Sequence, residues 1–317
     1  AGGSRRVVGR HSSFTLDGSG SRDPDSADGG ELQYAWACAD ASTGATCGVQ
    51  TSLRSTWMVS AAELSAEGTY EFTLTVSLGQ RAASTETMVK VATGTPPEVS
   101  ISSGVPATKP SPGDRLVLLG AAAPSFEGEQ LRFDWSASVS RADGDFQALD
   151  LTQPDLLSTP PSGVNLVVRP NQLDSGARYR FRLTVTGRDA EGFSEMEVTM
   201  NSAPQLGRIS ASPLSGSAVL DLFTIRAAGW QDEDEPLRYR FGAGEGTDYV
   251  LLSDFSPEAW TQATLPQGQP TQDYERVLVA EVADTFDAVA SASTVVTVTA
   301  FTPSGDRLQD TATELLG

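Results

Sequence analysis

Apolar and polar positions alternate along three short segments of the chain, spaced about a hundred residues apart. The segments are residues 32–36, 131–135 and 237–241, and each has an aromatic residue at its third and fifth positions. An alternation with a period of two is typical of a β-strand that buries one of its faces. The same strand is therefore predicted three times along the chain.

A second alternating pattern follows each of these segments. It covers residues 70–76 and 179–185, with a weaker copy at residues 274–279. Repeats of this length are whole domains, because the units of solenoid proteins run to only about 20–50 residues. About 100 residues is the usual size of an immunoglobulin-like sandwich. The sequence thus predicts an all-β fold of three tandem immunoglobulin-like β-sandwiches, an architecture more typical of spacers and ligand-presenting surfaces than of enzymes.

The predicted domains cover residues 1–94, 95–203 and 204–301, and residues 302–317 are expected to form a flexible tail or linker. Prolines occur at both junctions between the domains, and proline holds the chain extended. We therefore expect the sandwiches to be joined end to end by stiff connectors.

Particular residues of the first unit match features of such sandwiches. Trp36 occupies the position of the central tryptophan, and Tyr70 follows Gly68 as in a tyrosine corner, where the phenol oxygen bonds to nearby backbone. The chain before these strands, which carries Arg5 and Arg6, is interpreted as a basic arm.

The two cysteines, Cys38 and Cys47, lie within the first unit, and we interpret them as a disulfide. Two buried or free thiols are the alternative. The formal net charge is −19, with 41 acidic residues against 22 basic ones. Nucleic-acid binding is not expected, because neutralising phosphates requires a basic surface.

Four arginines form a stripe on the predicted outward face of the second unit. Two interpretations of the stripe remain open: a binding face for a sulfated or acidic glycan, or cross-strand pairing with Glu195 and Glu197, which also point outward. We favour pairing because opposite charges lie at matching positions. The arginines of the stripe are Arg132, Arg178, Arg180 and Arg182.

Catalytic and cofactor-binding residues are not expected. The single histidine, His11, lies in the arm, where nothing would hold it as a general base. Calcium needs six to eight oxygen ligands, and neither acidic cluster has the spacing of a calcium loop, so we interpret both as turn and capping residues. The clusters are Asp17, Asp23 and Asp25, and Asp232, Glu233 and Asp234.

Several segments, in order along nearly the whole chain, resemble the REJ (receptor for egg jelly) module. Residues 16–25 followed by 32–38 are similar to its PKD-like opening, and residues 179–185, 201–204 and 229–241 are similar to its later sections. The resemblance implies an extracellular part of a polycystin-1-like protein, built from PKD-like or fibronectin-III-like sandwiches. Arg276 departs from the pattern, because the other two units have Phe72 and Phe181 at that position.

The resemblance also implies a setting and partners. The parent protein would be anchored in a ciliary or flagellar membrane, and the module would act in adhesion and in mechanosensing. Its partners would be other extracellular domains of the same receptor or fibre, a glycoprotein, or a polycystin-2-type channel.

Two alternatives come from other classes of protein. One is a carbohydrate-binding or accessory region of a secreted enzyme, which exposed aromatic residues would favour; Trp57, Trp230 and Trp260 are not assigned to a predicted core face. The other is a subunit of an extracellular ciliary fibre.

Overall fold

The computed structural model of the chain describes residues 4–23, 31–65, 67–104, 109–141, 144–188, 190–244 and 246–301. The predicted tail, residues 302–317, lies outside them. The chain divides into two compact units, Ala1–Met200 and Asn201–Gly317, and each is considered by itself. The described residues form strands and three short 3-10 helices, η1 (Ala61–Glu63), η2 (Gly246–Asp248) and η3 (Pro270–Gln272). None of their helices is long and apolar enough to cross a membrane.

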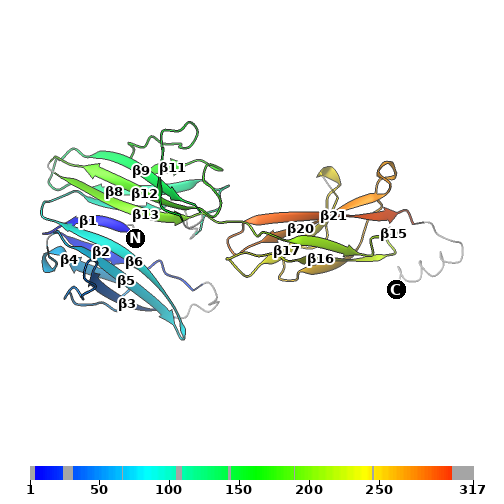
Figure 1. Cartoon of the computed structure of the whole chain (residues 1–317), viewed down its shortest axis with the longest axis horizontal. Coiled ribbons are helices and arrows are strands. Elements are labelled where there is room, and N and C mark those ends of the chain that lie inside the picture. The colour runs from blue at the N-terminus through cyan, green and yellow to red at the C-terminus, as the bar shows by residue number, and fades with distance from the viewer. Residues whose placement is uncertain are drawn as a thin grey trace. The chain divides into compact units, whose positions relative to one another are not determined.

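An eight-stranded sheet runs through the whole of the first unit (Figure 1). Two smaller sheets pack against it: β2 (Ser13–Asp17) with β4 (Thr56–Ser60), and β7 (Glu98–Ser103), β8 (Leu116–Ala123) and β11 (Leu166–Val168). The strands of the large sheet, in spatial order, are β10 (Gln147–Leu149), β9 (Arg132–Ser140), β12 (Arg178–Thr186), β13 (Glu191–Thr199), β1 (Arg5–Gly9), β6 (Arg81–Ala92), β5 (Thr69–Leu78) and β3 (Gln33–Asp40).

Strand β1 joins the two halves of this sheet. It pairs in parallel with β6 over five residues and antiparallel with β13 at Arg5↔Glu195 and Arg6↔Ser194. Figure 1 shows the blue β1 between the green β13 and the cyan β6. The interpretation of this segment as a basic arm is therefore wrong. Val7 and Val8, both buried, have the β-branched side chains that favour a strand.

Arg6 is buried although it is charged. Its Nη2 donates a 2.9 Å hydrogen bond to Thr15 O, and its guanidinium lies 5.0 Å from the centroid of the Phe14 ring. Burial lowers the pKa of Arg6, and the negative charge of Glu98 opposes that shift. Arginine can occupy such a site because its weakly hydrated, planar head stacks on an aromatic ring.

The two halves of the first unit are thus joined side by side through a sheet, and the expected end-to-end arrangement is wrong for this pair. Pro96 and Pro97, predicted to belong to the linker between the first two domains, are both buried. A Cβ atom on Gly192 would collide with the carbonyl oxygen of Pro97. The segment between β6 and β7 therefore packs directly against β13.

Three separate hydrophobic cores lie between the sheets. The first core is enclosed by β2 and β4 and by the β1, β6, β5 and β3 end of the large sheet; it includes Trp36 and Phe72. The second core lies under the other end of the large sheet and includes Trp135 and Phe181. The third core, in the second unit, includes Phe241. The division into three domains and their boundaries stays a prediction, because the first two cores share one sheet.

The predicted disulfide is present in the first core region. Cys38, on β3, is bonded to Cys47, and their Cα atoms are 5.7 Å apart, a separation within the usual range for a disulfide. The indole of Trp36 donates a 2.9 Å hydrogen bond to Arg54 O, and the indole of Trp135 makes the matching 3.0 Å bond to Gly163 O. The two cores therefore repeat each other in their central tryptophan.

The tyrosine corner is also confirmed. The Tyr70 hydroxyl accepts a 2.8 Å hydrogen bond from Ser65 N, and the Tyr179 hydroxyl accepts one of the same length from Asp174 N. Each bond ties the loop before a central strand back onto that strand.

Replacing Tyr70 with phenylalanine is expected to lower the free energy of unfolding by about 1–2 kcal/mol, because the Ser65 amide loses its partner. Chemical denaturation measures the change. Tyr34→Phe is the matched control, since no described residue bonds to the Tyr34 hydroxyl, and it should stay within about 0.5 kcal/mol of the parent. Equal losses in both variants would contradict a structural role for the corner.

The second unit consists of two sheets around the third core. One sheet has the order β14 (Arg208–Ser212), β16 (Leu222–Ala228), β19 (Trp260–Thr264). The other has the order β15 (Ser215–Ser217), β21 (Val289–Thr299), β20 (Glu275–Ala283), β17 (Arg238–Ala243), β18 (Val250–Leu251).

Arg276 explains why the third copy of the pattern is the weakest. It is buried on β20 and forms an ion pair with Asp248 at the end of η2, and its Nη2 donates a 3.0 Å hydrogen bond to Asp248 O. The register also corrects the match taken from the sequence, because Phe241 lies opposite Ala280 as Trp36 lies opposite Leu74. Arg276 therefore occupies the position of Tyr70, and Leu278 occupies that of Phe72.

Candidate interaction surface

The outward face of β12 and β13 carries the predicted arginine stripe. Because side chains alternate along a strand, Arg180 and Arg182 point away from Phe181, which is buried in the second core. Arg180 lies opposite Glu197 in the register, and Arg182 lies opposite Glu195. The prediction that these opposite charges share one face of the sheet is therefore confirmed.

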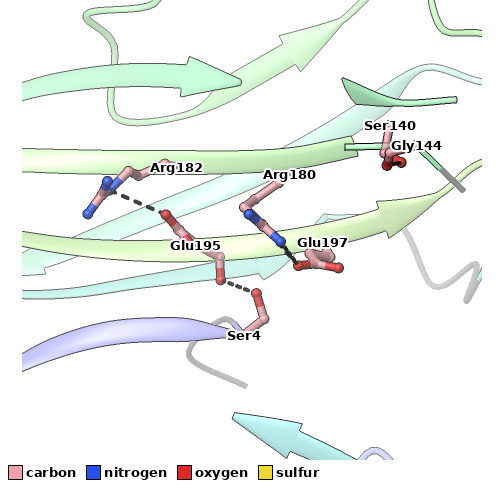
Figure 2. A network of polar contacts seen from close by, with 7 residues as sticks. All are labelled: Ser4, Ser140, Gly144, Arg180, Arg182, Glu195 and Glu197. Atoms are coloured by element: carbon pink, nitrogen blue, oxygen red, sulfur yellow. Dashed lines mark hydrogen bonds and ion pairs between the residues drawn. The ribbon is translucent and has the colours of Figure 1, made fainter. Parts of the chain in front are cut away.

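Each of these arginines is paired with the glutamate opposite (Figure 2). The Arg180 side chain donates to Glu197 Oε1 at 2.7 Å, and Arg182 Nε lies 3.6 Å from Glu195 Oε1. The interpretation of the stripe as cross-strand pairing is confirmed for these two arginines. Arg132, at the start of β9, is exposed and lies opposite Thr186 in the register, so it does not join them.

Two phenylalanines complete the surface, and the sequence reasoning missed both. The Arg180 guanidinium lies 4.0 Å from the centroid of Phe146, with Arg178 at 5.9 Å from the same ring. The Arg182 guanidinium lies 3.6 Å from the centroid of Phe193. Such contacts contribute about 0.5–1 kcal/mol each at exposed sites. Arg180 and Arg182 are therefore each held between an aromatic ring and a carboxylate.

Glu195, the partner of Arg182, also contacts the segment that begins β1, the strand that joins the two halves of the sheet. Ser4, next to β1, donates from its backbone N and from Oγ, the latter at 3.1 Å, to the backbone oxygen of Glu195 (Figure 2). The Glu195 side chain is itself buried, with Arg182 as its ion-pair partner. The charges of the stripe thus lie beside the junction between β13 and β1.

An equivalent arrangement lies on the second unit. Arg240, on β17, donates from Nε to Glu281 at 2.7 Å, and its guanidinium lies 4.4 Å from the centroid of Phe255. The hydrogen bond to Glu281 raises the pKa of Arg240. Arg238 forms an ion pair with Asp287 and lies 5.7 Å from the same ring. The sequence contains a signal for this second arrangement, because residues 178–181 and 238–241 are identical.

The coupling between Arg180 and Glu197 should be about 0.2–1 kcal/mol in a double-mutant cycle with alanine, because both side chains are partly exposed to solvent. Chemical denaturation of the two single variants and the double variant measures it. A cycle between Arg180 and the exposed Glu127 is the control and should give no coupling. A zero value for both pairs would show that the face gains nothing from its ion pairs.

The second acidic cluster is brought together only in part. Ligand oxygens of Asp232, Asp234 and the buried Asp284 lie within 4.8 Å of one another, whereas Glu233 is not in the group. Asp284 Oδ1 accepts hydrogen bonds from the backbone N of Phe286 and Ala288, at 2.8 and 2.9 Å. These bonds shape the loop after β20. Three carboxylates fall short of the six to eight oxygens of a calcium site, so the absence of bound metal stays a prediction.

Two members of the first acidic cluster, Asp17 and Asp23, lie in the part of the chain that the structure describes. Asp17 Oδ1 accepts a 2.9 Å hydrogen bond from Ser19 N, and hydrogen bonding by Ser19 lowers the pKa of Asp17. Asp23 forms a 2.5 Å ion pair with Arg81. Asp25 lies outside the described residues. The hydrogen bond from Ser19 N to Asp17 is of the kind that aspartate forms in turns, as the sequence predicted.

His11 is exposed in the turn between β1 and β2. That His11 does not act as a catalytic base stays a prediction.

Comparisons with known proteins identify the sequence family. The profile of the REJ domain matches residues 1–316. Human (Homo sapiens) polycystin-1 is 31% identical over 265 residues, which covers 79% of this chain and 6% of polycystin-1. The chain thus spans a small part of the length of that relative.

The solved structures that match this chain are distant from it in sequence. Three N-terminal domains of the bacteriophage RB49 highly immunogenic outer capsid protein (Hoc) are 11% identical, with 95% of this chain and 100% of that chain covered and a TM-score of 0.33. Domains A168–A170 from titin are 10% identical, with 84% and 88% covered and the same TM-score. Similarities this weak say nothing about a functional site or a function of this chain.

Proposed function

The chain belongs to the REJ domain family, and on that premise we propose that it is a non-enzymatic, extracellular segment of a polycystin-1-like receptor that supports adhesion to proteins or matrix. The observation that carries the proposal is the family match, which spans residues 1–316 together with the similarity to polycystin-1.

The contacts of the polar side chains support a structural role for this chain. The arginines of β12 and β17 are used in pairing with carboxylates and in stacking on rings. A catalytic site instead needs groups whose chemistry is held ready for a substrate. The surface described above therefore serves to stiffen the sheets.

The shared sheet of the first unit supports a role in bearing load or presenting a surface. Backbone pairing continues from β10 to β3, across both cores. Two cores joined in this way resist bending more than two domains connected by a free linker, because relative motion would break strand pairing. Such a block suits a receptor segment that holds other domains away from a membrane.

Surface labelling tests the extracellular placement. Antibodies raised against this chain should label intact, non-permeabilised cells that express the parent protein, and the antigen should remain with the cells after washing. Labelling only after permeabilisation would contradict the proposal. Antigen found only in the medium would instead favour the accessory region of a secreted enzyme or a subunit of an extracellular fibre.

The finer part of the proposal concerns a cilium or flagellum and a channel partner. It is supported only by the relationship to polycystin-1. The same antibodies should label the ciliary or flagellar membrane, and a polycystin-2-type channel should co-purify with the parent protein from that membrane. Uniform labelling of the cell body without the channel would contradict this part and leave the extracellular placement standing.

A further inference from the structure

One tryptophan of the chain is exposed on a sheet. Trp57 is buried in the first core, and Trp230 is half-buried against the third core. Trp260 is 44% exposed at the start of β19. An exposed indole on a flat strand is a stacking platform for a ligand with an apolar face.

Trp260 belongs to the outward face of the sheet formed by β14, β16 and β19. Arg226 lies opposite Trp260 in the register, and Thr224 lies opposite Gln262. Alternation along the strands assigns ten residues to this face. They are Arg208, Ser210, Ser212, Leu222, Thr224, Arg226, Ala228, Trp260, Gln262 and Thr264.

Two contacts hold the polar groups of this face beside the indole. Gln262 Nε2 donates a 2.9 Å hydrogen bond to Thr224 Oγ1, which fixes the side-chain amide. The Arg226 guanidinium lies 5.8 Å from the centroid of the Trp260 ring. A ligand would therefore meet an apolar ring flanked by a guanidinium group and by an amide that is already oriented.

The size of the face favours a small ligand over a protein. Three strands span about 10 Å and five residues span about 17 Å, a plane on the order of 200 Å². A stable protein interface needs roughly 800 Å² from each partner. A face of this size matches a short oligosaccharide.

The charge of the face favours a neutral ligand. None of its ten residues is acidic, and its cation nearest the indole, Arg226, already lies against the Trp260 ring. The chain as a whole carries a net charge of −19, which repels polyanions. Neutral hydroxyl groups, by contrast, bond equally well to amides, guanidinium groups and hydroxyls.

We propose that the outward face of β14, β16 and β19 binds a neutral oligosaccharide, with one hexopyranose ring stacked on Trp260 and its hydroxyl groups bonded to Gln262 and Arg226. The site lies apart from the arginine pairs described above. It adds a ligand class to the proposed receptor and does not depend on where the parent protein resides.

The test uses the whole chain on an array of neutral gluco-, galacto- and manno-oligosaccharides together with sialylated, sulfated and uronate-bearing ones. The neutral oligosaccharide with the strongest signal is then titrated by calorimetry. Trp260→Ala should weaken binding by about tenfold or more, and Gln262→Ala should weaken it to a smaller degree. Affinity should change little between about 50 and 500 mM NaCl, because no ion pair forms.

Phe126→Ala is the matched control, since Phe126 is a similarly exposed aromatic residue, at 46%, in the first unit. This variant should bind as the parent does. Thermal unfolding of each variant verifies that it is folded, which is expected because Trp260 and Gln262 are exposed. No binding to any neutral oligosaccharide, binding to acidic glycans alone, or binding unchanged by Trp260→Ala would overturn the proposal.

Discussion

Replacing Val8 with lysine should lower the free energy of unfolding of the first unit by about 3–5 kcal/mol. Val8 is 3% exposed on β1 and belongs to the first core. An ammonium group there would be buried without a carboxylate partner, and on the same face of the strand it would meet the charge of the buried Arg6. Chemical denaturation measures the loss, and hydrogen exchange locates it.

The position of the lost amide protection in the Val8→Lys variant distinguishes a strand shared by both halves from one that belongs to a single half. Because β1 pairs with both β6 and β13, amide protection should fall at residues 88–92 and also at residues 194 and 195. Arg5→Lys is the control, since Arg5 is exposed on the same strand, and it should leave stability within about 0.5 kcal/mol of the parent. A loss confined to β6 would contradict a strand shared by the two halves.

Replacing Gly120 with alanine should cost about 3 kcal/mol, because extra atoms in a packed core force backbone and side chains to shift. A Cβ atom at this position of β8 would collide with the carbonyl oxygen of Val164 and come within 2.6 Å of Leu183 Cδ2. The rigid carbonyl leaves little room for relaxation. Thermal and chemical unfolding of the variant measure the change.

Gly113 provides the control for this substitution. A Cβ atom on Gly113 would have Asn171 Oδ1 as its nearest neighbour, at 3.9 Å, so Gly113→Ala should be neutral or slightly stabilising by restricting the unfolded chain. If Gly120→Ala proved equally harmless, the close approach of β8 and residue 164 would be wrong.

Local patterns predicted the strands and the faces they bury. Trp36, Trp135 and Phe241 are all buried, as their alternation indicated. These predictions succeeded because the period of two and the bond of a tyrosine corner depend on residues close together in the sequence. The pairing of Arg180 with Glu197 also followed, since neighbouring strands of a sandwich fix which outward positions meet.

Contacts between distant segments could not be predicted in the same way. Strand β1 was missed because Arg5 and Arg6 suggested a solvated arm, and only tertiary packing shows that Arg6 stacks on Phe14 while β1 enters a sheet with β13. Phe146 lies in a loop whose path no periodicity reveals. Asp284 joins Asp232 and Asp234 across about fifty residues of sequence, a proximity set by the fold alone.

The side-by-side junction changes how the two halves of the first unit are expected to move relative to each other. A chain of independent sandwiches would flex at each connector, whereas the first unit offers one sheet over both cores.

Cross-strand nuclear Overhauser effects in the deuterated, amide-protonated chain provide the most direct test of this shared sheet. The structure predicts contacts from residues 5 and 6 to residues 194 and 195, together with contacts from residues 5–9 to residues 88–92. The second set without the first would mean that β1 belongs to the first core alone, and would contradict the account.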